Sequence, residues 1–114
     1  MGVNNTDDLI SLTADLDAIV ADLATPSSGN NGQTDVAVTN TPIVLGGSVA
    51  IRGVVLKAKD DNTNPVYFGF SNAVTTSTGF ELWNLDAQPV WIDNLNKIYI
   101  VGTAGDGVTY FYIV

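Results

Sequence analysis

The residues of this chain that could perform chemistry are mostly oxygen ligands, because the sequence contains no histidine and no cysteine. Histidine is the side chain that most often acts as a general base near neutral pH, and cysteine supplies the reactive thiolate. A serine nucleophile therefore has no histidine base. The sequence also holds neither a Gly-x-Ser-x-Gly elbow nor a Gly-x-x-x-x-Gly-Lys-Ser/Thr phosphate loop. Carboxylate and amide oxygens are what is left for catalysis or ion binding.

Paired aspartates are the remaining candidates for acid–base catalysis. Two carboxylates can cleave a glycosidic bond, and the available pairs are Asp60 with Asp61 and Asp86 with Asp93. Both pairs lie in or beside predicted turns, where aspartate is common because its side chain bonds to the nearby backbone. We therefore expect solvated turn residues, and we predict that the protein is not an enzyme and has no catalytic residues.

The segment Asp60-Asp61-Asn62-Thr63-Asn64 also places oxygen ligands at alternate positions, as the start of an EF-hand calcium loop does. An EF-hand requires glycine at its sixth position and glutamate at its twelfth. This chain has Pro65 and Ser71 there. We interpret the segment as a turn and expect neither a metal ion nor another cofactor.

The composition is that of a folded, acidic protein. Of its 114 residues 46% are hydrophobic, and 12 acidic against 4 basic residues give a net charge of −8. Four scattered cations cannot neutralise a run of phosphates, so we expect no nucleic-acid partner and no attraction to anionic membranes. No apolar run is long enough to span a membrane, and the start of the sequence lacks the pattern of a secretory signal peptide.

Residues 1–24 carry a helical pattern. Their large apolar residues recur at intervals of three and four, which places them on one face of an α-helix. Asp7 and Asp8 suit the positive end of the helix dipole, and Pro26 prevents continuation of the helix. We predict an amphipathic helix that mediates oligomerisation or attachment through a stripe of five residues, Leu9, Leu12, Leu16, Ile19 and Leu23.

This helix is weak by itself. The segment contains five aspartates and no basic residue, and a helix of fewer than 20 residues is marginal in water. We therefore expect it to need a trimeric body or a partner surface. A second interpretation is that it folds back on its own β-domain as part of the core. The polar segment 25–34, which we predict to be a flexible linker, argues against that interpretation.

From residue 35 to residue 114, short β-forming runs alternate with turn-forming residues. This pattern predicts a mainly β fold, a small antiparallel β-sandwich or barrel of jelly-roll type, with the short N-terminal α-helix attached. Gly105-Asp106-Gly107 predicts a hairpin between the last two strands. The final strand is apolar on both faces, so it is either central or buried against another subunit. We expect strands at 36–40, 43–45, 49–58, 66–70, 80–83, 90–92, 97–101 and 108–114.

Aromatic residues of the β-region could also stack against sugar rings. Alternation along the strands directs about half of them inward, and core packing is the expected role of each. A carbohydrate-binding face is the alternative. The aromatic residues concerned are Tyr67, Phe68, Phe70, Trp83, Trp91, Tyr99, Tyr110, Phe111 and Tyr112.

Residues 49–112 resemble the β-domain of capsid decoration (cement) and head-fibre proteins of tailed bacteriophages. The resemblance is carried by an ordered set of segments: Ile51 to Ala58, Asn62 to Gly69, Gly79 to Leu82, Ile92 to Gly102, and Gly105 to Tyr110. This chain departs from the pattern at residues 83–89, where a Pro-Gly turn would be expected. We interpret the replaced loop as rebuilt for a local contact.

The resemblance implies a structural protein of the virion surface, commonly a homotrimer, whose partner is the major capsid protein of an assembled phage head. In such proteins an N-terminal helical segment often mediates trimerisation or attachment, and no catalytic residues carry over. It also implies synthesis in the host cytoplasm and a final location on the capsid surface. A fibre or spike tip, or a carbohydrate-binding module that uses exposed aromatic residues, is the alternative function.

Overall fold

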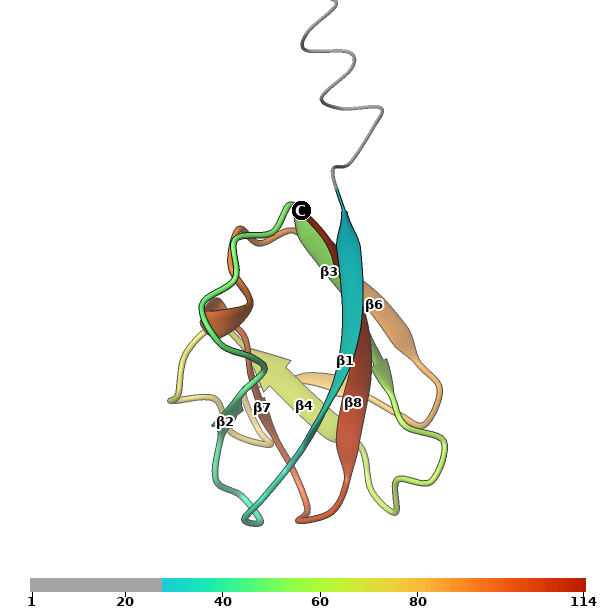
Figure 1. The fold of residues 1–114 in the computed structure, drawn as a ribbon. Helices are drawn as coiled ribbons and strands as arrows, with labels where there is room; N and C mark the ends of the chain where they lie inside the picture. Colours follow the sequence, from blue (N-terminus) through green and yellow to red (C-terminus); the bar gives the residue numbers. More distant parts are fainter. Residues whose placement is uncertain (1–27) are drawn as a thin grey trace, which may run out of the picture.

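The computed structural model describes residues 28–114 (Figure 1). The predicted helix at 1–24 and residues 25–27 of the predicted linker lie outside the described residues, and so do Leu9, Leu12, Leu16, Ile19 and Leu23. Within the described part of the chain, no helix is long and apolar enough to cross a membrane.

Two four-stranded antiparallel sheets form the described part of the chain, which confirms the prediction of a small β-sandwich. Sheet A has the order β1-β8-β3-β6, with β1 Gly29–Asp35, β8 Gly107–Ile113, β3 Gly53–Ala58 and β6 Ala87–Val90. Sheet B has the order β2-β7-β4-β5, with β2 Ile43–Val44, β7 Tyr99–Val101, β4 Val66–Gly69 and β5 Phe80–Leu82. A 3-10 turn, η1 (Leu95–Lys97), precedes β7.

The core lies between the sheets and follows the alternation of the strands. In β3 the side chains of Val54 and Leu56 are buried, whereas Lys57 between Leu56 and Ala58 is exposed. This period of two is what a strand with one buried face requires. The core cluster consists of Val36, Leu45, Ile51, Val54, Leu56, Ala58, Val66, Phe68, Leu82, Val90, Leu95, Ile98, Ile100 and Val108.

The linker prediction is wrong for residues 29–34, because they form most of β1. This strand pairs with β8 along its whole length, from Gly29 opposite Ile113 to Asp35 opposite Gly107. Its polar sequence is compatible with a strand at the edge of the sheet, since pairing uses the backbone rather than apolar side chains. The sandwich therefore begins at residue 29 instead of residue 35.

The segment 36–40, predicted as a strand, is a turn instead. Val36 is buried and its backbone bonds to the loop before β8, through Val36 N–H to the Asp106 carbonyl at 2.8 Å. Asn40 then adopts a φ of 61°, in the left-handed region that asparagine tolerates better than most residues. The chain leaves sheet A here and enters sheet B at β2.

The predicted hairpin at Gly105-Asp106-Gly107 is also wrong. β7 pairs with β2 and β4, whereas β8 pairs with β1 and β3, so the segment between them is a corner that joins the two sheets. Gly105 has a φ of 93°, which suits glycine, and its N–H donates to the Val36 carbonyl at 2.9 Å. Turn-forming residues mark a reversal of the chain in a hairpin and in a corner between sheets alike, so they do not specify which strands pair.

Buried polar side chains tie this corner to the turn at residues 60–64. The carboxylate of Asp106, which is 4% exposed, accepts hydrogen bonds from the backbone N–H groups of Thr63 and Asn64 at 2.9 and 3.0 Å. The buried side-chain amide of Asn62 donates to the Gly107 carbonyl and accepts from the Gly107 N–H, both at 2.9 Å. Asn62 therefore pairs with Gly107 much as a strand residue would.

The final strand, β8, is central in sheet A, which is the first of the two interpretations of its apolar sequence. It pairs with β1 on one side and β3 on the other. Phe111 and Ile113 nevertheless remain 56% and 38% exposed, because they point away from the core. The carboxyl terminus lies beside the start of β1 (Figure 1).

Candidate functional site

The aspartates considered for catalysis or ion binding lie on the surface of the described domain. Asp60 and Asp61 are exposed in the turn after β3, and the Asp86 carboxylate accepts from the Trp83 N–H at 3.1 Å. Asp93 forms an ion pair with Lys97 at 2.7 Å, and the Lys97 ammonium lowers the pKa of that carboxyl. Residues 28–114 contain no group of three or more histidine, cysteine, aspartate or glutamate side chains placed to hold a metal ion.

The outer side of sheet A carries a set of apolar side chains, which we call the apolar face: the half-buried Val55 and the exposed Pro89, Trp91, Phe111 and Ile113. The register of the sheet places them together, because Val55 lies opposite both Phe111 and Pro89 on the neighbouring strands. Strands present alternate residues to the same side, so Phe111 and Ile113 share this side of β8. These side chains, with Gly53, surround a hollow of about 130 Å³.

Trp91 is the most exposed large apolar residue of the described domain, at 87%. Its indole ring lies over Gly53: a Cβ atom placed on that glycine would lie 3.4 Å from the ring carbon Cε3. Gly53 itself pairs with Ile113. The absence of a side chain at residue 53 therefore lets the indole ring lie against sheet A.

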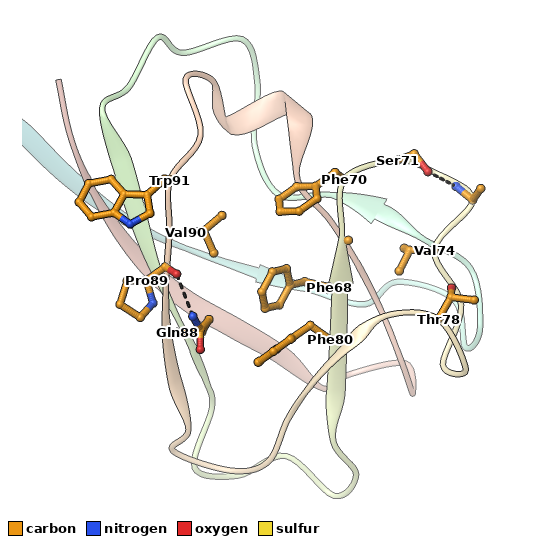
Figure 2. Close-up of a pocket in the computed structure, with 12 residues that line it drawn as sticks. Phe68, Phe70, Ser71, Val74, Thr78, Phe80, Gln88, Pro89, Val90 and Trp91 are labelled. Atoms are coloured by element: carbon orange, nitrogen blue, oxygen red, sulfur yellow. Dashed lines mark hydrogen bonds between the residues drawn. The ribbon is translucent and has the colours of Figure 1, made fainter.

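A second feature is a cleft of about 610 Å³ between the β6 edge of sheet A and strands β4 and β5 of sheet B (Figure 2). On the sheet B side, Phe68 packs against Phe80 with ring centroids 5.2 Å apart and against Phe70 at 6.4 Å. Figure 2 shows Pro89, Val90 and Trp91 on the opposite side. The polar side chains that line the cleft are Ser71, Thr78 and Gln88.

A third feature is the turn at residues 83–86, which holds Trp83 and Leu85 in solvent at 57% and 58% exposure. Glu81 orients the tryptophan, because its carboxylate accepts hydrogen bonds from the indole N–H of Trp83 and from the Tyr67 hydroxyl. The bond to Glu81, at 2.9 Å, raises the pKa of the Tyr67 phenol. The aromatic side chain of Trp83 is thus exposed but held by a hydrogen bond.

The backbone of this turn is fixed as well. Leu85 has a φ of 68°, a left-handed conformation that costs a non-glycine residue about 1–2 kcal/mol. Its N–H donates to the Ala58 carbonyl at 3.1 Å, and the Asn84 side chain donates to the Asn62 carbonyl at 2.7 Å. These bonds maintain a conformation in which an apolar side chain points into water.

The alternation of the strands separates the aromatic residues as the sequence suggested. Phe68 is buried, and Tyr110 and Tyr112 pack against the core with ring centroids 6.3 Å apart. Phe70, Trp83, Trp91 and Phe111 are exposed. Tyr67 and Tyr99 are half-buried.

Phe80, which the sequence reasoning did not select, is 52% exposed and lines the cleft. Its place opposite Phe68 in the β4–β5 pair is the signal that could have found it. The stripe residues Leu9, Leu12, Leu16, Ile19 and Leu23 lie outside the described residues. Comparisons of the chain with protein-family models, with curated proteins and with solved structures found no match.

Proposed function

We propose that this protein is a non-enzymatic attachment protein of a bacteriophage particle. In this proposal it is a homotrimeric capsid decoration (cement) protein that binds the major capsid protein of the assembled head and stabilises it. The observation that carries the proposal is the turn with Trp83 and Leu85, where two large apolar side chains are held in solvent by a hydrogen-bonded framework. Strained and exposed positions of this kind cluster at binding sites.

The place of this turn in the sequence adds support. It coincides with residues 83–89, where the chain departs from the pattern of the decoration proteins that residues 49–112 resemble. A loop rebuilt around two exposed apolar residues fits a contact that is specific to one capsid lattice. The resemblance, rather than the fold, makes the phage head the proposed partner and the virion surface the proposed location.

Stabilisation of the head follows from linkage. A protein that binds a site present only in the assembled lattice lowers the free energy of that lattice relative to free subunits. Three-fold avidity in a homotrimer would make modest contacts by each protomer sufficient. The stripe Leu9, Leu12, Leu16, Ile19 and Leu23 remains the proposed element for self-association or docking, and the negative charge keeps the free protein soluble.

The test is binding of the purified protein to expanded, undecorated phage heads. We expect stoichiometric binding and a higher melting temperature of the heads. Leu85→Asn should remove most of this binding, because it deletes the apolar side chain and keeps a residue that tolerates a positive φ. Val38→Asn is the matched control, since Val38 is 59% exposed on a different loop. Loss of binding in both variants, or in neither, would contradict the role of the 83–86 turn.

A carbohydrate-binding module is the second candidate, and the cleft between the sheet edges favours it. Exposed Phe70 and Phe80 could stack on a sugar ring, while Thr78 and Gln88 could bond to its hydroxyl groups. Titration of a Trp83→Phe variant with a glycan panel, followed by the fluorescence of the remaining Trp91, tests this function. Phe70→Ser should abolish the response, and Val38→Ser, which changes an exposed apolar residue on a different loop, should leave it intact. Glycan binding without binding to heads would replace the decoration proposal.

A further inference from the structure

We propose that the apolar face of sheet A is the docking site for residues 9–23 of the same chain. The inference concerns what covers Val55, Pro89, Trp91, Phe111 and Ile113, and it does not rest on the proposed capsid role. It assigns to the Leu9–Leu23 stripe a partner surface within the chain. Under this inference the stripe does not mediate self-association, and trimerisation uses other surfaces of the domain.

The apolar face leaves a large amount of apolar surface in solvent. Trp91 is 87% exposed, Phe111 56% and Ile113 38%, and the three lie on one side of one sheet. Contiguous exposed apolar residues of this kind mark an interaction site in a soluble domain. The solvated face of an antiparallel sheet is usually polar, whereas Trp91, Phe111 and Ile113 make this part of the outer side of sheet A apolar.

The sequence pattern of residues 9–23 is suited to such a face. Residues 9–23 carry an apolar stripe with helical spacing, and such a stripe must be buried against another element to be stable. A helix of this length spans about 21 Å at 1.5 Å per residue. The seven-residue strands β1 and β8 have a similar length of about 23 Å. The predicted helix is therefore short enough to lie along the outer side of sheet A, with part of its stripe over the apolar face.

The chain enters sheet A beside the apolar face. Gly29 pairs with Ile113, and the Val114 N–H donates to the Ser28 carbonyl at 2.9 Å. Gly53 and Trp91 lie in the same row as Ile113, so the segment that precedes residue 28 joins the domain at one end of the apolar face. The docking site is therefore next to the point where the segment is attached.

The connection is long enough to reach the site. Residues 24–28 separate Leu23 from Gly29, and five residues extend to about 17 Å. The distance across sheet A from β1 to β6 is about 14 Å, or three strand spacings. A connection this short gives the segment an effective concentration near the millimolar range at its own sheet. At micromolar protein concentration the same chain is therefore favoured over a second copy.

Charge complementarity supports the same occupant. The segment 7–22 contains five aspartates and no basic residue. Lys57 is exposed in the next row of sheet A, paired with Thr109 and Ala87, and is the basic residue within the strands of this sheet. Attraction between Lys57 and the acidic flanks of the stripe would help to orient the segment on the face.

The experiment uses the full chain with Trp83→Phe, so that Trp91 is its single tryptophan. Acrylamide quenching and the emission maximum then report whether Trp91 is covered. We expect weak quenching in this parent protein and a severalfold stronger quenching, with red-shifted emission, after Leu16→Asp. Ala14→Asp is the matched control, because it introduces the same charge on the opposite side of the predicted helix, and it should leave quenching unchanged.

A second variant changes sheet A instead of the segment, so that the test does not depend on how Leu16→Asp affects helix formation in the segment. Phe111→Ser should also increase quenching of Trp91, and the double variant should add little to either single change. Circular dichroism checks that the β-domain stays folded, as expected for changes at an exposed side chain and outside the domain. The inference is overturned if acrylamide quenches Trp91 fully in the parent protein, or if Trp91 stays protected after Leu16→Asp.

Mass measurement over a dilution series identifies the occupant. Protection of Trp91 that persists in a monomer supports the segment of the same chain. If dilution removes both the protection of Trp91 and the mass of an oligomer, the face is covered by a second copy, and the contact within one chain is overturned. Binding to phage heads is a separate readout: its failure would refute the proposed function and leave the Trp91 result unaffected.

Discussion

Replacing Asp106 by alanine removes the carboxylate that joins the turn at 60–64 to the corner between the two sheets. This carboxylate is 4% exposed and accepts from the backbone N–H groups of Thr63 and Asn64 at 2.9 and 3.0 Å. It also accepts from the Thr63 hydroxyl at 3.2 Å. After the change, both backbone groups lose their acceptor, and the neighbouring Asn62 side chain is already bonded to Gly107.

The expected loss of stability follows from these contacts. A hydrogen bond to a charged group contributes about 1.5–3 kcal/mol, so two such bonds contribute about 3–6 kcal/mol. Thr63 and Asn64 are themselves exposed, and water can replace part of what is lost. We therefore expect the free energy of unfolding to fall by about 3 kcal/mol, which lowers the Tm of a domain of this size by roughly 12–24 °C.

Urea unfolding followed by tryptophan fluorescence measures this change, with calorimetry as a second probe. Asp60→Ala is the matched control, because it removes the same charge from an exposed position in the same turn. With a net charge of −8, loss of an exposed carboxylate should be neutral or slightly stabilising. A loss below about 1 kcal/mol for Asp106→Ala, or equal losses in both variants, would refute the role assigned to the buried carboxylate.

Three further predictions concern the strained turn and two titrating groups. Leu85→Asn should raise the free energy of unfolding by about 0.5–1 kcal/mol, since asparagine tolerates the φ of 68°; a destabilised variant in urea would contradict this. Glu81→Gln should lower the pKa of Tyr67 towards its ordinary value of about 10, because the carboxylate that holds the phenolic proton is lost. Spectrophotometric titration of the phenol measures it, and an unchanged titration curve would argue against the bond. The hydrogen bond to Asp35 raises the pKa of Lys59. The stability that this pair contributes is therefore complete below the unfolded-state lysine pKa of about 10.4, and it is lost as the pH rises through the folded-state pKa. Urea unfolding at increasing alkaline pH should show a steeper decline than in Asp35→Asn, and parallel declines would refute the pair.

Local pattern in the sequence was sufficient for the fold class and for most strands of the core. The period of two in residues 53–58 and 66–69, and the apolar run near the end of the chain, mark strands because a sheet with a buried face imposes that period. The turn-forming residues at 60–64 and 105–107 likewise mark reversals. These features depend on near neighbours in the chain, so they can be read without knowledge of the tertiary structure.

For the candidate site, the sequence identified the aromatic residues but not which of them are exposed. In β8 both alternating sets are apolar: Tyr110 and Tyr112 pack on the core, while Phe111 and Ile113 face outward. Nothing within the strand distinguishes the two sets. Which set is buried depends on which side of sheet A faces sheet B, and the packing of the two sheets decides this.

The sequence by itself determined that residues 35–114 are mainly β, a small antiparallel β-sandwich or barrel, and that the chain offers no histidine or cysteine chemistry. Only the tertiary structure decided that the polar segment 29–34 is a strand and that Gly105-Asp106-Gly107 joins two sheets rather than a hairpin. The physical reason is that β1 is held by backbone bonds to β8 and the corner by the buried carboxylate of Asp106. Both depend on partners at least 40 residues away in the chain, which no local pattern specifies.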